Sequence, residues 1–113
     1  MTDDDCLFCS IVAGDVPSDI VAETDHAVAF RDINPQAPTH VLVIPRVHQP
    51  DIGSLAEAEP EATNDLLLLA RRLADEAGGS YRLVFNTGAD AAQTVFHCHA
   101  HVLAGRSFGW PPG

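Results

Sequence analysis

The sequence predicts a domain of mixed α-helix and β-strand, and three stretches carry this prediction. Residues 97–105 alternate histidine with apolar side chains, and a period of two is that of a β-strand. Residues 40–44 form a nearly continuous apolar run, which is typical of a central strand covered on both faces. Residues 61–77 read as one long helix, which two glycines end. The chain of 113 residues has the size of a single domain.

Shorter elements are expected before the central strand. A C-x2-C pair opens an apolar segment, residues 6–12, which predicts a short helix. Residues 20–23 and 27–30 are strand candidates joined by a hairpin turn, in which His26 is expected to be exposed. Two prolines in residues 32–39 indicate an ordered loop.

The second half begins with helix signals. Residues 54–57 have the spacing of a capping box, which predicts a helix start, and Pro60 suits the first turn of a helix. Four consecutive leucines, residues 66–69, cover more than one side of the long helix. A second helix packed against it is therefore expected, most simply from a symmetric dimer. The alternative is a monomer with an apolar exposed helix.

The last part of the chain contains two strands and a tail. Residues 81–86 are the next strand candidate, and a loop of small residues, 87–94, leads into the histidine strand. Prolines keep the tail, residues 106–113, extended. Disorder is expected at residues 1–5, and no second domain is indicated.

Charge and composition exclude several classes of function. The formal net charge is −10, with six arginines and no lysine, which argues against a broad nucleic-acid-binding surface. No apolar run is long enough to span a membrane, and the N-terminus lacks the basic region of a signal peptide, so a cytoplasmic location is expected. Three cysteines without an export signal favour metal binding or packing over a disulfide framework.

Three imidazoles on one face of a strand indicate chemistry rather than packing, because burying them without partners would cost free energy. They could hold a catalytic metal, or one could be a nucleophile that its neighbours orient. The nucleophile hypothesis predicts a neighbouring loop with amides and a hydroxyl for a phosphate, and residues 88–94 fit it. Cys6 and Cys9 could chelate a metal, form a redox pair or simply pack. Cys98 points to the opposite, core face.

Residues 93–103, with His-x-His-x-His among apolar residues, resemble the signature of the histidine triad (HIT) superfamily. The loop 32–40 and the terminal Trp-Pro-Pro-Gly, residues 110–113, are similar to its nucleotide-binding (HINT) branch. The match runs from about Cys6 to the last residue. This resemblance implies an α+β fold, an antiparallel sheet of about five strands with one long helix and a short N-terminal helix, paired into a homodimer. It also implies binding of purine nucleoside monophosphates and hydrolysis of nucleoside 5′-phosphoramidates.

The resemblance assigns a role to each site residue. His99 would be the nucleophile that forms a covalent nucleotidyl-imidazole, His101 would lie near the leaving group, and His40 would support the triad from behind. Residues implied to contact the nucleotide are Phe8, Ile11, Asp32, Ile33, Asn86, Thr94, Val95 and, reaching toward the partner's site, Trp110.

Bacterial relatives of this type carry a structural zinc ion, and the ligands that match are Cys6, Cys9, His48 and His97. Two thiolates and two imidazoles form a closed tetrahedral set, which suits a structural zinc, one per chain.

The chain departs from the family pattern at several positions. Ala91 and Ala92 stand where family members commonly have glycine, Thr94 replaces a usual serine, and Gly109, before the tryptophan, departs from the eukaryotic form. The expected activity is phosphoramidate hydrolysis. Alternatives are hydrolysis of dinucleoside polyphosphates, nucleotide binding with incidental activity, and a catalytic metal on the triad.

Overall fold

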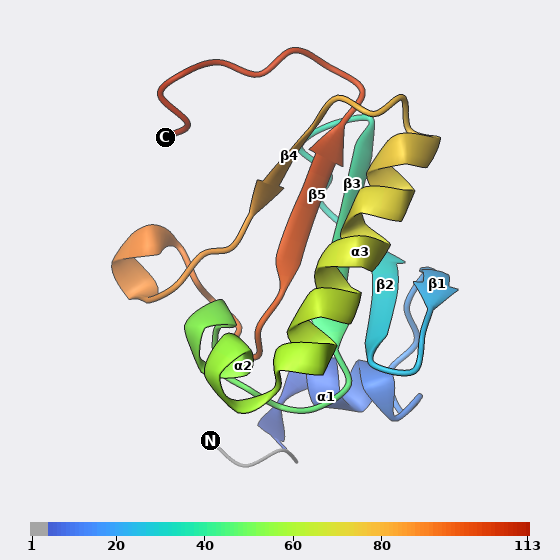
Figure 1. Ribbon diagram of the computed structural model, residues 1–113, viewed down its shortest axis with the longest axis vertical. Helices are drawn as coiled ribbons and strands as arrows, with labels where there is room; N and C mark the ends of the chain where they lie inside the picture. Colours follow the sequence, from blue (N-terminus) through green and yellow to red (C-terminus); the bar gives the residue numbers. More distant parts are fainter. Residues whose placement is uncertain (1–4) are drawn as a thin grey trace.

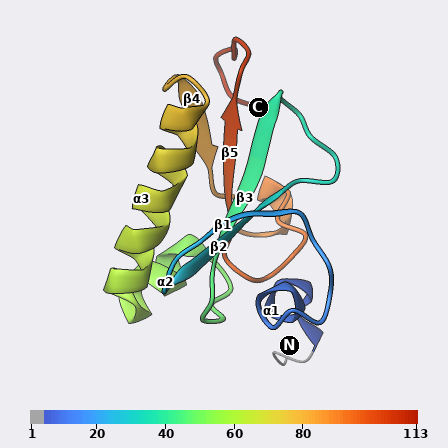
Figure 2. The same cartoon turned by 90° about the vertical axis from the view of Figure 1, so that its right-hand side faces the viewer.

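The computed structural model describes residues 5–113 and has an α+β fold. Its five strands form one antiparallel sheet, as expected, and the structure gives their order as β1-β2-β3-β5-β4. Helices α2 and α3 lie on one face of this sheet, and α1 lies on the other (Figures 1 and 2). The elements in chain order are α1 (Leu7–Val12), β1 (Ile20–Glu23), β2 (Ala27–Arg31), β3 (Thr39–Pro45), α2 (Ile52–Ala58), α3 (Pro60–Glu76), β4 (Tyr81–Val84) and β5 (Ala100–Ala104). The segment expected to be disordered, residues 1–5, lies outside the described residues except for Asp5.

Each face of the sheet has its own apolar cluster. Alternate residues of β3 divide between them: Val41 and Val43 pack under α3, whereas Leu42 and Ile44 pack against α1. This division follows from the period-two geometry of a strand buried on both faces. The run 40–44 is therefore the central strand that the sequence predicts.

The strand that carries the histidines is shorter than predicted. It begins at Ala100 rather than His97. Continuing the register of β3 with β5, which pairs Val43 with Ala100, would place Cys98 opposite Pro45. Proline has no N–H to donate to a ladder. The amide of Cys98 instead donates to the carbonyl of Gln49 at 2.7 Å, so the chain leaves the sheet there.

The strand expected at residues 81–86 is also shorter, ending at Val84, because β5 pairs with it only as far as His101. The hairpin of β1 and β2 is confirmed, and His26 in its turn is exposed.

The capping box at residues 54–57 does not begin a helix. Helix α2 begins earlier, at Ile52, where the Asp51 side chain accepts a hydrogen bond from the Ser54 amide at 2.8 Å. Asp51 rather than Ser54 is therefore the N-cap, and Ser54 lies inside the helix. Glu59, with φ −137° and ψ 70°, separates α2 from α3, since a residue before proline avoids helical angles.

Helix α3 is the long helix that the sequence predicts, and it ends at Glu76. It buries Leu66, Leu69 and Leu73 against the sheet but leaves Leu67 and Leu68 with 39% and 54% of their surface exposed. Within residues 5–113, no helix is long and apolar enough to cross a membrane.

Candidate functional site

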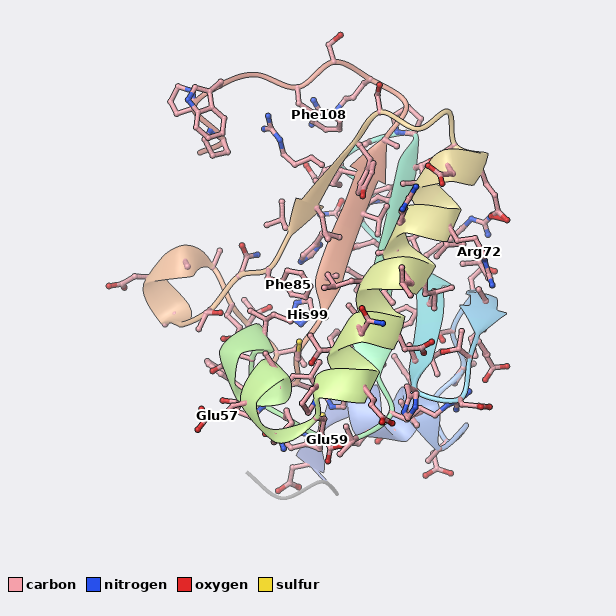
Figure 3. All side chains as sticks on the ribbon, viewed as in Figure 1. Glu57, Glu59, Arg72, Phe85, His99 and Phe108 are labelled. Carbon is pink, nitrogen blue, oxygen red and sulfur yellow. The ribbon has the colours of Figure 1, made fainter. Side chains whose placement is uncertain are left out.

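The histidines of the triad lie on the α1 side of the sheet, where β5 begins. In β5, His101 lies opposite Leu42 of β3, which belongs to the α1-side cluster. His99 immediately precedes β5, beside the sheet in Figure 3. Cys98 packs in the α3-side cluster, as predicted, and burial raises the pKa of its thiol to about 12, with a smaller contribution from Asp51.

A backbone carbonyl fixes the tautomer of His99. Its Nδ1 lies 2.8 Å from the carbonyl oxygen of His97. A carbonyl oxygen only accepts, so Nδ1 must carry the hydrogen. In a neutral imidazole the other nitrogen, Nε2, then holds a lone pair. The His99 ring is buried and packs edge-on against Phe8 at 5.0 Å between ring centroids, which restricts its orientation.

A second backbone group fixes His40 and, through it, His101. The amide of Gln36 donates to Nδ1 of His40 at 2.9 Å, so Nε2 of a neutral His40 carries the hydrogen. That Nε2 lies 2.9 Å from Nδ1 of His101 and donates to it. Neutral His101 therefore carries its own hydrogen on Nε2. His99 and His101 have ring centroids 5.1 Å apart. Their Nε2 nitrogens therefore differ: Nε2 of neutral His99 has a lone pair, whereas Nε2 of neutral His101 carries a hydrogen.

The pKa values agree with neutral rings. Burial lowers the pKa of His101 to about 4, His99 and His40 act in the same direction, and Asp32 opposes them. Burial also lowers the pKa of His40, against the pull of Asp32. Asp32 Oδ2 lies 3.4 Å from Nε2 of His40, but the ring is neutral at pH 7 and donates its one hydrogen to His101, so this contact is not an ion pair.

The same hydrogen bonds argue against a catalytic metal held by the triad and its neighbours. Nitrogen and oxygen atoms of Asp32, His40 and His101 lie within 4.8 Å of one another. A metal ligand needs a free lone pair. Because Nε2 of His40 carries a hydrogen whenever Gln36 donates to Nδ1, this donor set does not fit a metal.

A separate cluster gathers two cysteines and two histidines from three parts of the chain. The ligand atoms of Cys6, Cys9, His48 and His97 all lie within 4.8 Å of one another. Cys6 caps α1, where its sulfur accepts from the Cys9 amide, and His48 follows β3. His97 Nε2 donates to the carbonyl of Pro45 at 2.9 Å, so its Nδ1 faces the sulfurs with a lone pair.

The spacing in this cluster fits a tetrahedral zinc ion. Around such an ion, bonds of about 2.3 Å to sulfur and 2.0 Å to nitrogen separate two nitrogens by roughly 3.3 Å, and a nitrogen from a sulfur by roughly 3.5 Å. The two Nδ1 atoms of His48 and His97 are 3.1 Å apart. Sulfur to nitrogen distances are 3.4 Å for Cys6 to His97, 3.4 Å for Cys9 to His97 and 3.3 Å for Cys9 to His48. The donor set and its spacing therefore fit zinc.

An apolar pocket lies beside the triad. It has a volume of about 440 Å³. Four residues that the resemblance assigns to the nucleotide line it, namely Phe8, Ile11, Asp32 and Ile33. Phe8 forms a wall of the pocket and also contacts His99, so the structure brings the pocket and the triad together. Asp32 is held at the rim by the Asn34 amide, which donates to Oδ1 at 2.8 Å.

The other residues that the resemblance assigns to nucleotide binding lie farther along the chain. Val95 packs against the α1-side cluster, and Asn86 is half-buried just after β4. Thr94 is exposed in the segment before His97. Trp110 has 84% of its surface exposed on the tail and is not among the residues that line the pocket.

The sequence gives no direct signal for three groups that orient the site. The amide of Gln36 and the carbonyls of Pro45 and His97 act through the backbone, and any residue type offers such groups. Gln93 is a different case, because it is a buried side chain. Its amide group accepts from Gly88 N and donates to the carbonyls of Pro50 and Val95. A long polar side chain in a loop of small residues is the sequence signal that could have indicated this role for Gln93.

The two alanines in this loop differ in conformation. Ala91 ends a short 3-10 helix, Ala89–Ala91, whereas Ala92 has the left-handed angles φ 68° and ψ 26°. Left-handed angles disfavour any side chain with a Cβ. The departure from glycine therefore falls on a strained position at Ala92.

Fold and site together define a class: an α+β domain with a triad of differently bonded histidines and a thiol-imidazole cluster. The model of the HIT domain matches residues 13–108. The chain is 42% identical to a 14 kDa zinc-binding protein of Zea mays over 118 residues, which cover 100% of this chain and 91% of the maize protein.

Solved structures agree. A HIT family hydrolase from Legionella pneumophila is 44% identical, with a TM-score of 0.91, and the match covers 96% of this chain and 100% of that chain. A histidine triad nucleotide-binding protein from Candida albicans is 30% identical, with a TM-score of 0.80 and coverage of 96% and 85%. The chain belongs to the HIT family.

Proposed function

We propose that this protein hydrolyses the P–N bond of purine nucleoside 5′-phosphoramidates through a covalent intermediate on His99. One observation carries the proposal. The His97 carbonyl holds the hydrogen of His99 on Nδ1, which leaves the Nε2 lone pair as the nucleophile. The name of the Legionella hydrolase supports hydrolysis, and the name of the Candida nucleotide-binding protein supports a nucleotide as the substrate.

In this mechanism Nε2 of His99 attacks phosphorus, the P–N bond breaks and the leaving nitrogen needs a proton. An anionic phosphoryl group raises the pKa of a neighbouring imidazole, so His101 takes up a proton with the substrate. Neutral His101 already holds a hydrogen on Nε2 and accepts from His40 on Nδ1, so the added proton breaks the bond to His40 or reverses it. His101 then protonates the departing amine. Water attacks the nucleotidyl-imidazole, gives its proton to neutral His101, and releases the nucleoside monophosphate.

The pocket is the proposed site of the nucleoside. Phe8 and Ile11 form the apolar walls for a purine base, with Ile33 at the mouth and the Asp32 carboxylate accepting from the ribose hydroxyls. Asn86, Thr94 and Val95 are the proposed contacts on the phosphate side, and Trp110 is proposed to reach the partner's site. A volume of about 440 Å³ lies within the range of small-molecule sites.

We propose further that the thiol-imidazole cluster holds one structural zinc ion per chain. Its four protein ligands leave no position for substrate. The ion would join α1 to the segment that follows β3 and to the segment before β5. The name of the maize relative supports this proposal.

A homodimer is also proposed. Strand β4 lies at the edge of the sheet, where one side of its backbone has no neighbouring strand in the described chain. Leu67 and Leu68 leave apolar surface exposed on α3. An edge strand and an apolar helix are surfaces that a second copy would cover.

The experiment compares His99→Ala with His26→Ala, which removes an exposed imidazole far along the chain from the triad. On an adenosine 5′-phosphoramidate, His99→Ala is expected to lower kcat by at least about 10³-fold, because the nucleophile is lost. Binding of adenosine monophosphate should persist, and His26→Ala should behave as wild type. Equal turnover in His99→Ala would overturn the mechanism. Faster turnover of a dinucleoside polyphosphate than of any phosphoramidate would overturn the substrate class, and no turnover of either would leave a binding protein.

A further inference from the structure

Arg106, the first residue of the tail, is held in place by three contacts. Its Nε donates to the carbonyl of Gln36 at 2.9 Å, and its Nη1 donates to the carbonyl of Ser107 at 2.9 Å. Its guanidinium lies 4.2 Å from the ring centroid of Phe108, within the range of a cation–π contact. The contacts with Ser107 and Phe108 already fix the planar guanidinium, so it loses little further conformational freedom when its Nε holds a neighbouring group.

The neighbouring group is the loop that orients His40. Gln36, whose carbonyl accepts from Arg106, also donates its amide to Nδ1 of His40 at 2.9 Å. A chain of hydrogen bonds therefore runs from Arg106 through Gln36 and His40 to Nδ1 of His101. One end is an exposed guanidinium, and the other is the imidazole proposed to protonate the leaving group.

A close backbone contact brings the tail to this loop. Gly105 has φ +92°, and a Cβ added there would lie 2.9 Å from Cβ of Pro38. Only glycine allows so close an approach at these angles. Arg106 therefore begins beside the loop, and its contact with Gln36 follows from the path of the chain.

We propose that Arg106 is a positioning residue for the reaction, because it fixes the Gln36 amide that decides the tautomer of His40. This inference rests on the proposed function. If Gln36 moves away, Nδ1 of His40 loses its donor, and the ring gains access to the tautomer with a lone pair on Nε2. His101 would then donate from Nδ1, and its Nε2 would lose the hydrogen it holds in the resting site.

The chain offers a matched control in Arg82. Its guanidinium also lies over the Phe108 ring, at 5.3 Å, and its Nη2 donates to the carbonyl of Gly109 at 2.8 Å. Both arginines anchor the tail near Phe108, which Figure 3 shows above the upper ends of β4 and β5. The hydrogen bond to the carbonyl of the loop residue Gln36, however, comes from Arg106. An effect that substitutions of Arg82 and Arg106 share is attributed to loosening of the tail. An effect seen only when Arg106 is substituted is attributed to the loop that contains Gln36.

The experiment compares Arg106→Met, Arg106→Lys and Arg82→Met with wild type. Methionine keeps an apolar chain over Phe108 but removes the donors. We expect Arg106→Met to lower kcat roughly tenfold, less than the ~100-fold that a 1 Å misplacement can cost. KM should change by less than about twofold, because the base pocket is untouched. Arg106→Lys should recover little, since a point charge does not reproduce the fork. Arg82→Met should keep kcat.

Nuclear magnetic resonance of the same proteins tests the position directly. In wild type, the ¹⁵N shifts of His40 should show an unprotonated Nδ1 and a protonated Nε2. In Arg106→Met the two shifts should move toward one another, and the Gln36 amide should exchange at least tenfold faster with solvent, which corresponds to about 1.4 kcal/mol of opening free energy. Arg82→Met should retain the wild-type values.

Identical kcat, His40 shifts and Gln36 exchange in Arg106→Met and Arg82→Met would overturn the inference. If wild type hydrolyses no phosphoramidate, the proposed function fails instead. The His40 shifts and Gln36 exchange still decide whether Arg106 holds the loop, so the two failures are distinguishable.

Discussion

Nε2 of His40 donates a hydrogen bond to Nδ1 of His101 across 2.9 Å. The bond joins β3 to β5, two adjacent strands of the sheet, and it runs between residues 61 positions apart. Its direction is set by the Gln36 amide, which occupies the other nitrogen of His40. The part-buried pair is stable as two neutral rings, so the stability of the fold is expected to depend on pH.

Stability should fall in mild acid because of His101. The pKa of His101 in the folded chain is about 4, below its ordinary value of 6.5. The unfolded chain therefore takes up this proton as the pH falls below 6.5, whereas the folded chain resists until about pH 4. Stability is unaffected above pH 6.5 and declines between these values, by up to about 1.4 kcal/mol per pH unit for one proton.

His101→Gln removes this titration and should flatten that slope. Urea unfolding at several pH values between 4 and 7 measures it, with His26→Gln, an exposed site, as the control. The same slope in His101→Gln as in wild type would show that the proton is taken up elsewhere.

Zinc should be present at one equivalent per chain and should stabilise the fold. Cys9→Ser and His48→Ala each remove one of four ligands, so both should lose zinc and melt at lower temperature. The stabilisation lost reaches about 4 kcal/mol where free zinc is 1,000 times its Kd. Elemental analysis and thermal unfolding measure these effects.

The control is Cys98→Ala, which removes a thiol from the α3-side core and leaves the cluster complete. It should retain one zinc ion. Purified wild type with less than a tenth of an equivalent, never exposed to a chelator, would contradict the assignment.

Ala92→Gly should stabilise the protein. The left-handed angles of Ala92 place its Cβ against the following carbonyl, which costs about 1–2 kcal/mol. Glycine relieves that strain and loses part of the gain to chain entropy, so the free energy of unfolding should rise by about 1 kcal/mol. Chemical denaturation measures the change.

Ala91→Gly serves as the matched comparison, because Ala91 belongs to the 3-10 helix before the left-handed residue. Glycine there should lower stability by about 0.5–1 kcal/mol. Destabilisation by both substitutions to the same extent would refute the argument from strain.

The chain should be a dimer that charges on α3 disrupt. Leu67→Glu with Leu68→Glu places two carboxylates on the exposed apolar surface of the helix. Burying them in an interface would be strongly unfavourable, so the variant should be a monomer. Light scattering should give twice the chain mass of 12.0 kDa for wild type and the single mass for the variant.

His26→Glu is the control for added negative charge, since His26 is exposed in the turn between β1 and β2, and β1 lies at the edge of the sheet opposite β4. It should remain dimeric. A wild-type mass of one chain at micromolar concentration would contradict the dimer.

The sequence by itself determined the kind and order of the main elements, but not all of their bounds, and the opposite faces of the histidine segment. Period two in residues 97–105 put Cys98 in the core and the imidazoles on the other face, because alternation depends on the backbone and not on its partners. The apolar run of β3 and the long helix α3 followed from patterning in the same way.

Tertiary structure decided what each imidazole does. The strand begins at Ala100 because its partner strand ends in Pro45, a constraint that lies far from residues 97–99 in the sequence. His97, His99 and His101 look alike in sequence, yet they differ because three distant or backbone partners occupy one nitrogen of each: the Pro45 carbonyl, the His97 carbonyl and His40. Hydrogen-bond direction depends on which donor lies within about 3 Å, and only the folded chain brings such groups together.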